Sequence, residues 1–229
     1  MRRTIGKWAA LRWAAVAVIG AVAVAGCGQL QLGAAALYGG QRVSSTKLAE
    51  EVANLNAGYQ QYKRKLQIGY GQPAMPREVL SWILRFATAD KVAADRGIVV
   101  TPGQAQRALA VEAARIRQAG ETLTEAAVAN GLPPDMLPQL GRWFVIVLRL
   151  QSQLDGGHPP TTPAGTQALS VQVNHVQCVA ARSLDIKVNP QYGGYDYTQL
   201  AVVPVASTLA AGPLAGGKLA PSPRLTPAC

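Results

Sequence analysis

The sequence predicts a mainly helical domain that begins and ends with a short strand and is followed by a disordered tail. Three observations lead to this prediction. Apolar residues recur at helical spacing over most of the chain between 45 and 183. Short apolar segments at 35–38 and 184–188 have the pattern of strands. Residues 201–229 are rich in Ala, Gly, Pro and Ser and hold too few bulky apolar groups to offset the entropy lost on ordering.

The first 26 residues have the features of an export signal. Four basic residues and no acidic residue accompany an apolar run at 14–25, which is short for a helix that must cross a bilayer with about 20 residues. The run ends in Val24-Ala25-Gly26-Cys27, which resembles the lipobox of bacterial lipoproteins. The resemblance implies cleavage before Cys27 and a diacylglyceryl group on its sulfur. We therefore expect a signal peptide at 1–26 and a lipidated linker at 27–33; an unmodified cysteine at a helix end is the alternative.

The folded part should begin with a strand, a turn and the most regular helix of the chain. The strand at 35–38 precedes Gly39 and Gly40, which favour a turn. Over 45–66 the apolar residues recur at steps of four and three, which places them on one helical stripe. These residues are Leu48, Val52, Leu55, Tyr59, Tyr62 and Leu66. Ser44 and Ser45 are suited to cap the first turn.

Four more helices are predicted before residue 155. The second covers 76–96, ends at Gly97 and turns Val79, Leu80, Ile83, Leu84 and Ala87 inward. The third, to 118, and the short fourth, to 129, begin with the capping boxes Thr101-x-x-Gln104 and Thr122-x-x-Glu125. The fifth starts near 133. Its expected inward face consists of Leu137, Leu140, Phe144, Val147 and Leu154.

Prolines and glycines at 155–163 must interrupt the fifth helix. Over 167–183 a helix is favoured with a stripe of Ala168, Val171, His175, Cys178 and Val179, although Leu169, Val171 and Val173 also alternate as in a strand. Leu184, Ile186 and Val188 then predict a closing strand. About 200 residues after the signal are enough for one domain and a tail.

Charge and composition exclude several classes of function. The chain holds 22 basic and 12 acidic residues, and four of the basic ones lie within the signal, so the mature chain keeps a net charge of +6. This charge is scattered, which argues against a nucleic-acid partner and favours attraction to anionic lipid or cell-wall polymer. Once Cys27 is lipidated, Cys178 and Cys229 remain as a candidate disulfide in an oxidising compartment, but the spacing does not fix the geometry.

No catalytic or metal-binding pattern is present in the sequence. The two histidines, His158 in a proline-rich loop and His175 in a helix, are not near a recognisable nucleophile, and there is no Cys-x-x-Cys pair or cluster of His and carboxylates. The glycine-rich segments lack the context of a phosphate-binding loop. We therefore expect neither catalytic residues, nor a metal, nor a cofactor.

Three stretches in order resemble the N-terminal region of SurA-type extracytoplasmic chaperones. The segment 35–44 with the following helix is similar to the family's opening strand and "G-D-x-I-T" turn, with Gln41 in the acidic position. Residues 92–101 and 123–149 are similar to its "A-x-x-x-G-I-x-V-T" passage and "G-L-x-x-x-x-L" helix pair. Residues 184–193 are similar to its closing "D-V-x-V-N-P-R-Y-G", with Gln191 in place of Arg. The resemblance implies a domain at 34–200.

The resemblance also implies a function. It is the binding of unfolded or extended exported polypeptides in a helical cradle held at the extracytoplasmic face of the membrane by lipid. Many relatives carry a parvulin prolyl-isomerase insertion, for which residues 156–165 leave no room, so isomerase activity should be absent. Candidate client-contacting aromatics are Trp82, Phe86, Trp143 and Phe144, and ordinary core packing is their alternative role. The competing hypothesis is a structural lipoprotein of the cell envelope without chaperone activity.

Overall fold

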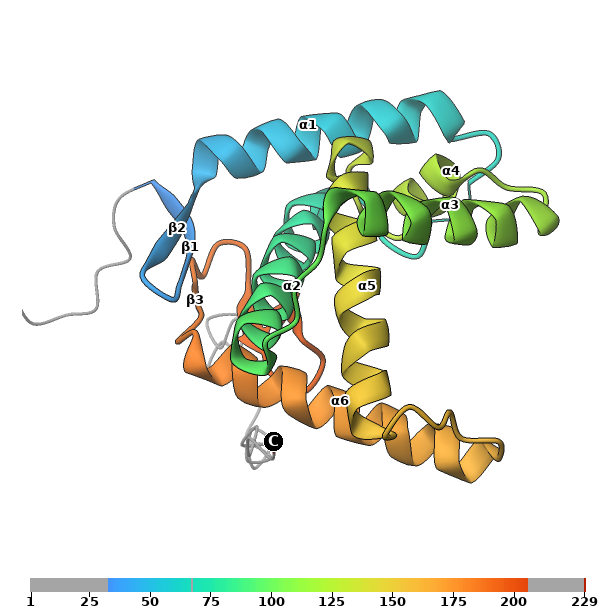
Figure 1. The fold of residues 1–229 in the computed structure, drawn as a ribbon. Coiled ribbons are helices and arrows are strands. Elements are labelled where there is room, and N and C mark those ends of the chain that lie inside the picture. Colours follow the sequence, from blue (N-terminus) through green and yellow to red (C-terminus); the bar gives the residue numbers. More distant parts are fainter. Residues whose placement is uncertain (1–32, 67, 206–228) are drawn as a thin grey trace, which may run out of the picture.

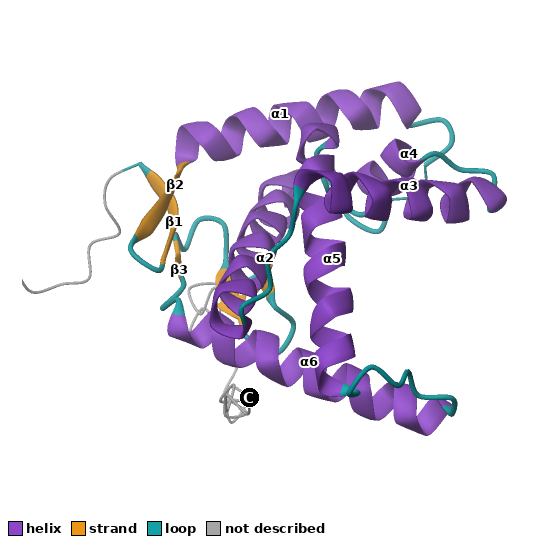
Figure 2. Cartoon of the chain, in the orientation of Figure 1, coloured by secondary structure: helices purple, strands orange, loops and turns teal. Residues whose placement is uncertain are grey.

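The computed structural model describes residues 33–66, 68–205 and 229. The predicted fold class, mainly helical with short strands, is confirmed (Figures 1 and 2). The helices of the described residues are α1 (Ser45–Tyr62), η1 (Gln72–Ala74), α2 (Met75–Arg96), α3 (Pro102–Gln118), α4 (Leu123–Ala129), η2 (Pro134–Met136), α5 (Leu137–Leu154) and α6 (Pro163–Ser183), where η marks a 3₁₀ turn. The strands are β1 (Ala34–Tyr38), β2 (Gln41–Ser44), β3 (Lys187–Val188), β4 (Gly194–Asp196) and β5 (Ala201–Val203).

Local side chains and one glycine set several helix ends at the residues that the sequence predicts. The hydroxyl of Ser44 accepts a hydrogen bond from the Lys47 amide at 3.0 Å and caps α1. Both predicted capping boxes form at the starts of α3 and α4. Gly97 ends α2 with φ at 65°, a left-handed conformation that glycine adopts without steric cost.

The two ends of the domain meet in a small antiparallel sheet. Its strand order is β2-β1-β3, so β1 lies in the middle and pairs Ala36 with both Val43 and Val188. The amide of Asn189 donates to the carbonyl of Ala35 at 2.9 Å, which extends this contact. The predicted opening and closing strands are therefore neighbours, and β2 forms one edge of the sheet.

Helix α2 lies at the centre of the fold. It packs against α1, α5, α6 and β5, while α1 and α6 cross opposite ends of the α2–α5 pair (Figure 1). The N-terminal half of α2 joins α1 and the sheet in one apolar core that includes Leu48, Leu55, Leu80 and Leu84. Its C-terminal half joins α5 and α6 in a second core around Val92 and Leu150.

The structure corrects several predictions of extent and orientation. Helix α1 ends at Tyr62 rather than residue 66, and a 3₁₀ turn precedes α5. The inward face of α5 is centred on Leu140, Val145, Ile146 and Leu150, so the predicted stripe is rotated. On α6, Val171, His175 and Val179 are exposed, and the buried residues are Val173, Gln177, Cys178, Ala180 and Ala181.

The domain extends beyond its predicted end at residue 200. Residues 201–203, which composition assigns to a disordered tail, form β5 and pair with β4. Val202 is buried, and its amide donates to the Ser81 hydroxyl on α2 at 2.9 Å, which explains why this short apolar segment is ordered. Cys178 on α6 and Cys229 form a disulfide. The predicted signal peptide, Cys27 and most of the linker lie outside the described residues.

Candidate binding groove

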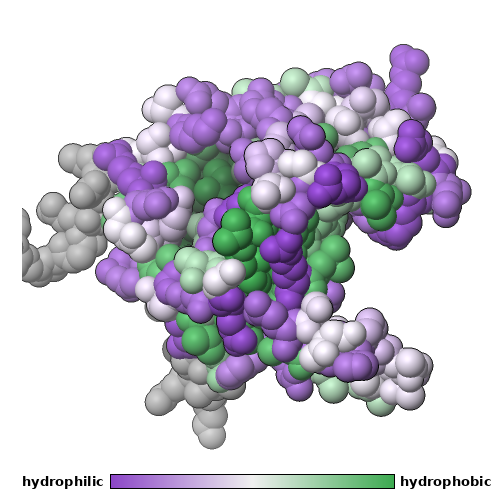
Figure 3. All heavy atoms as spheres, in the orientation of Figure 1, coloured by the Kyte–Doolittle hydropathy of each residue, from purple (hydrophilic) through white to green (hydrophobic). Residues whose placement is uncertain are grey.

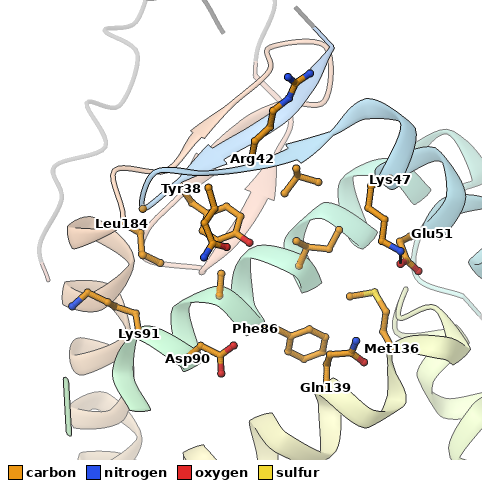
Figure 4. A pocket seen from close by; sticks show the side chains of 15 residues that line it. Tyr38, Arg42, Lys47, Glu51, Phe86, Asp90, Lys91, Met136, Gln139 and Leu184 are labelled. Carbon is orange, nitrogen blue, oxygen red and sulfur yellow. Dashed lines mark ion pairs between the residues drawn. The ribbon is translucent and has the colours of Figure 1, made fainter. Parts of the chain in front are cut away.

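A groove of about 520 Å³ lies between the β1–β2 hairpin, α1, α2 and the start of α5. Its apolar wall consists of Val43, Ile83, Phe86, Ala87, Met136 and Leu184. Figure 4 shows Phe86 of α2, Met136 of η2 and Leu184 at the end of α6 pointing toward one another, and Figure 3 shows apolar surface in the hollow between α1 and α2. The volume lies within the ~300–1,000 Å³ that is typical of ligand sites.

The groove forms because α1, α2 and the η2–α5 junction pack together in the core and separate toward the surface. Ile83, Phe86 and Ala87 occupy the side of α2 next to that of Leu80 and Leu84, which are fully buried. Helix α1 begins immediately after β2 ends at Ser44. Its first turns therefore lie above α2 and form one wall of the groove. Met136 contributes to the opposite wall, and its side chain is buried at the η2–α5 junction.

The four aromatic residues predicted to contact clients come together in one cluster. Trp82 lies 5.6 Å from Phe86 and 6.3 Å from Trp143, and Trp143 lies 5.3 Å from Phe144, measured between ring centroids. Phe86 lines the groove, whereas Trp82 and Phe144 do not. Trp143 lines a small adjoining pocket of about 30 Å³ together with Phe86. The cluster therefore mainly forms the packing behind the groove wall.

Polar contacts fix this cluster in place. The indole nitrogen of Trp82 donates to the carbonyl of Asn130 at 2.8 Å, which ties α2 to the end of α4. The guanidinium of Arg85 lies 4.5 Å from the centre of the Trp82 ring, a cation–π distance. Burial lowers the pKa of Arg85 from its usual value. These contacts fix the position of Trp82, whose ring packs beside Phe86 at the groove.

Charged residues surround the apolar wall. At the α1 end, the Lys47 ammonium lies 2.5 Å from a carboxylate oxygen of Glu51, and this hydrogen bond raises the pKa of Lys47. At the α2 end, Asp90 pairs with Arg142 at 2.7 Å. Burial, followed by the nearby charge of Asp90, raises the pKa of Tyr38. The groove thus combines an apolar wall with separate polar ends.

Sequence reasoning did not identify the groove itself. The sequence predicts Ile83 and Ala87 on the inward face of the second helix, Val43 in the turn after the opening strand and Leu184 in the closing strand, without any indication that they share a surface. The only sequence feature that relates to the groove is the order of the elements, because the segments 35–44 and 184–193 are predicted to begin and end one domain. Pairing of β1 with β3 brings both segments to the groove.

The remaining site expectations concern metals, catalysis and the membrane. Within the part of the chain that the structure describes, no group of three or more His, Cys, Asp or Glu side chains could hold a metal ion. His158 in the α5–α6 loop and His175 on α6 are exposed, and neither lines the groove. Among the described helices, none combines the length and apolar character needed to cross a bilayer.

Comparison with known proteins gives no relative for this chain. No family model, no curated protein and no solved structure matches it. The resemblance to SurA-type chaperones therefore depends on the three sequence stretches, of which the first and third form the sheet beside the groove.

Proposed function

We propose that the protein is a membrane-tethered, non-catalytic chaperone that binds unfolded or extended exported polypeptides. The observation that carries this proposal is the groove, with its apolar wall of residues from β2, α2, η2 and the end of α6 and its polar ends. Unfolded chains expose apolar side chains next to polar backbone, and a groove of this composition matches both.

The position of β2 supports an extended ligand. β2 is an edge strand of the described sheet, and Gln41, Arg42 and Val43 of this strand line the groove. An extended polypeptide in the groove would therefore lie next to backbone that can accept another strand. Backbone pairing is independent of ligand sequence, as a chaperone with many clients requires.

The tether belongs to the same proposal. A diacylglyceryl group on Cys27 would hold the domain at the extracytoplasmic membrane face, where exported chains emerge. Mass spectrometry of the native N-terminus tests this part, because a lipid-modified Cys27 has a defined mass. An unmodified thiol, or a mature chain that starts elsewhere, would contradict the tether.

The chaperone activity is tested by aggregation of an unfolded reporter, followed by light scattering. Residues 28–229 at near-stoichiometric amounts should slow aggregation, and an equal mass of an unrelated soluble protein should not. No effect on aggregation, together with binding to cell-wall material, would favour the structural envelope lipoprotein instead. Turnover of a proline-isomer test peptide should equal the rate in buffer, and a faster rate would contradict a non-catalytic role.

A further inference from the structure

The α1 end of the groove carries more negative than positive charge. Glu51 lines the groove, and Glu50 on α1 and Asp135 in η2 lie beside it; among the described residues, Lys47 is the cation that these three carboxylates act on. Lys47 lies 2.5 Å from Glu51 and 4.0 Å from Glu50. The amide of Asn54 donates to Asp135 at 2.6 Å, but this contact adds no positive charge. Three carboxylates therefore share one ammonium.

Glu51 is the central residue of this end. It lines the groove, its exposed fraction is only 4%, and Figure 4 shows its carboxylate at the edge where α1 and Met136 face one another. One carboxylate oxygen pairs with Lys47, but the other is buried, and within the described chain no N–H or hydroxyl group donates to it; besides Lys47, the side-chain partner of this carboxyl is the carboxyl of Asp135. A buried carboxylate oxygen without a donor is strongly unfavourable, so this site requires a proton or a cation.

Two other cations near the groove pair with other carboxylates. Lys91 pairs with Asp95, and Arg142 pairs with Asp90. A proton can relieve the repulsion, because burial, the charge of Glu51 and a hydrogen bond between the two carboxyl groups raise the pKa of Asp135. A ligand that brings its own ammonium or guanidinium would satisfy the same oxygens without that proton.

We propose that the Glu51–Asp135 end of the groove is a subsite for a Lys or Arg side chain of the bound polypeptide. This inference rests on the proposed function, since it assigns the client chemistry of the same groove. The preferred client segment combines apolar residues, which contact Ile83, Phe86 and Ala87, with one cationic side chain that reaches Glu51. The overall charge of the protein is positive and would repel such a segment, so any preference for it must arise locally.

The test compares two peptides that differ in one charge. Both are extended, fluorescein-labelled and rich in Val and Leu, with a central Lys in one and Nε-acetyl-lysine in the other. Binding to the full chain in detergent micelles is measured by fluorescence anisotropy. We expect the Lys peptide to bind at least tenfold more tightly, which corresponds to about 1.4 kcal/mol.

Variants locate the effect. Glu51→Gln should bind both peptides equally, because the amide keeps the shape and removes the charge. Glu121→Gln is the control, because Glu121 is exposed in the loop between α3 and α4 and does not line the groove, so this variant should keep the full preference. Should Glu51→Gln fail to fold, the comparison of the two peptides on the unmodified protein still decides.

The outcomes separate this inference from the proposed function. Equal binding of both peptides to the unmodified protein would overturn the cationic subsite and leave the peptide-binding function in place. Binding of neither peptide would overturn both proposals. An unchanged preference in Glu51→Gln would overturn the assignment to this end of the groove.

Discussion

Replacement of Gly141 by alanine should destabilise the domain, although alanine favours helices. Gly141 is buried on α5, where it faces α3. A Cβ atom at this position would lie 2.6 Å from the backbone carbonyl oxygen of Ala105 and 2.7 Å from Cγ of Leu109. Ordinary contacts of this kind begin near 3.4 Å, so the two helices would have to separate by about 0.8 Å.

Two opposing effects set the size of this change. Overpacking a close interface costs about 1–3 kcal/mol, because backbone cannot rotate away as a side chain can. Replacing a glycine inside a helix by alanine recovers up to about 1 kcal/mol. We expect a net loss of about 1–2 kcal/mol, which lowers Tm by roughly 2–8 °C for a domain of this size. Thermal unfolding followed by circular dichroism measures it.

Gly103 supplies the matched control. It lies on α3, the partner helix, and a Cβ atom there would meet only the Arg107 side chain at an ordinary 3.6 Å. Gly103→Ala should therefore leave Tm equal or slightly higher. A Gly141→Ala protein with a Tm at or above that of the unmodified chain would refute the close α3–α5 contact.

Three further predictions concern the groove, the disulfide and the carboxylates. Ala87→Trp should fill the groove and weaken peptide binding at least tenfold by anisotropy, while Val111→Trp, at an exposed site on α3, should not; equal affinities would count against the groove. Loss of the Cys178–Cys229 disulfide in Cys229→Ser should lower stability by about 4 kcal/mol for a separation of 51 residues, seen in urea unfolding, whereas free thiols in the untreated protein would contradict it. The raised pKa of Asp135 means that its protonated form adds stability below the ordinary pKa of 3.8, which is lost as the pH rises through the raised pKa. Asp135→Asn should therefore gain stability relative to the unmodified protein as the pH rises above 3.8, and parallel urea-unfolding profiles in the two proteins would refute this.

Helix positions were predictable because their signals are local. Thr101 with Gln104 and Thr122 with Glu125 accept hydrogen bonds from backbone amides within four residues. A capping box therefore marks a helix start in nearly any fold. Gly97 ends α2 for an equally local reason. The β4–β5 hairpin was missed because strands of three residues are too short to show alternation, and Val202 is ordered by a hydrogen bond to Ser81, 121 residues away.

Helix faces were less predictable, because burial depends on which side a neighbour covers. On α6, the small residues Ala180 and Ala181 pack into the core, while the larger Val171 and Val179 remain exposed. A hydrophobicity pattern gives greater weight to valine, although small side chains allow two helices to approach more closely. The same limit applies to the groove, whose wall residues belong to segments that meet only through the sheet and α2.

The rigid support of the groove bears on how tightly it can bind. Helix α2 supplies Ile83, Phe86 and Ala87 to the wall and is covered on its other sides by α6, β5 and the aromatic cluster. A wall that is already ordered loses little entropy when a ligand binds, so more of the apolar contact energy appears as affinity. The ligand itself, if extended and unfolded, bears most of the ordering cost. Weak, reversible binding of many segments is therefore the expected behaviour.

The length of the linker determines where this binding would occur. If Cys27 carries the lipid, the seven residue steps from Cys27 to Ala34 span at most about 25 Å, at up to about 3.6 Å per step. β1 begins at Ala34, and its hairpin with β2 forms one wall of the groove. The groove would then lie within about one bilayer thickness of the membrane surface. Exported chains would reach it before they could fold, which is when apolar segments with a neighbouring lysine or arginine are still exposed.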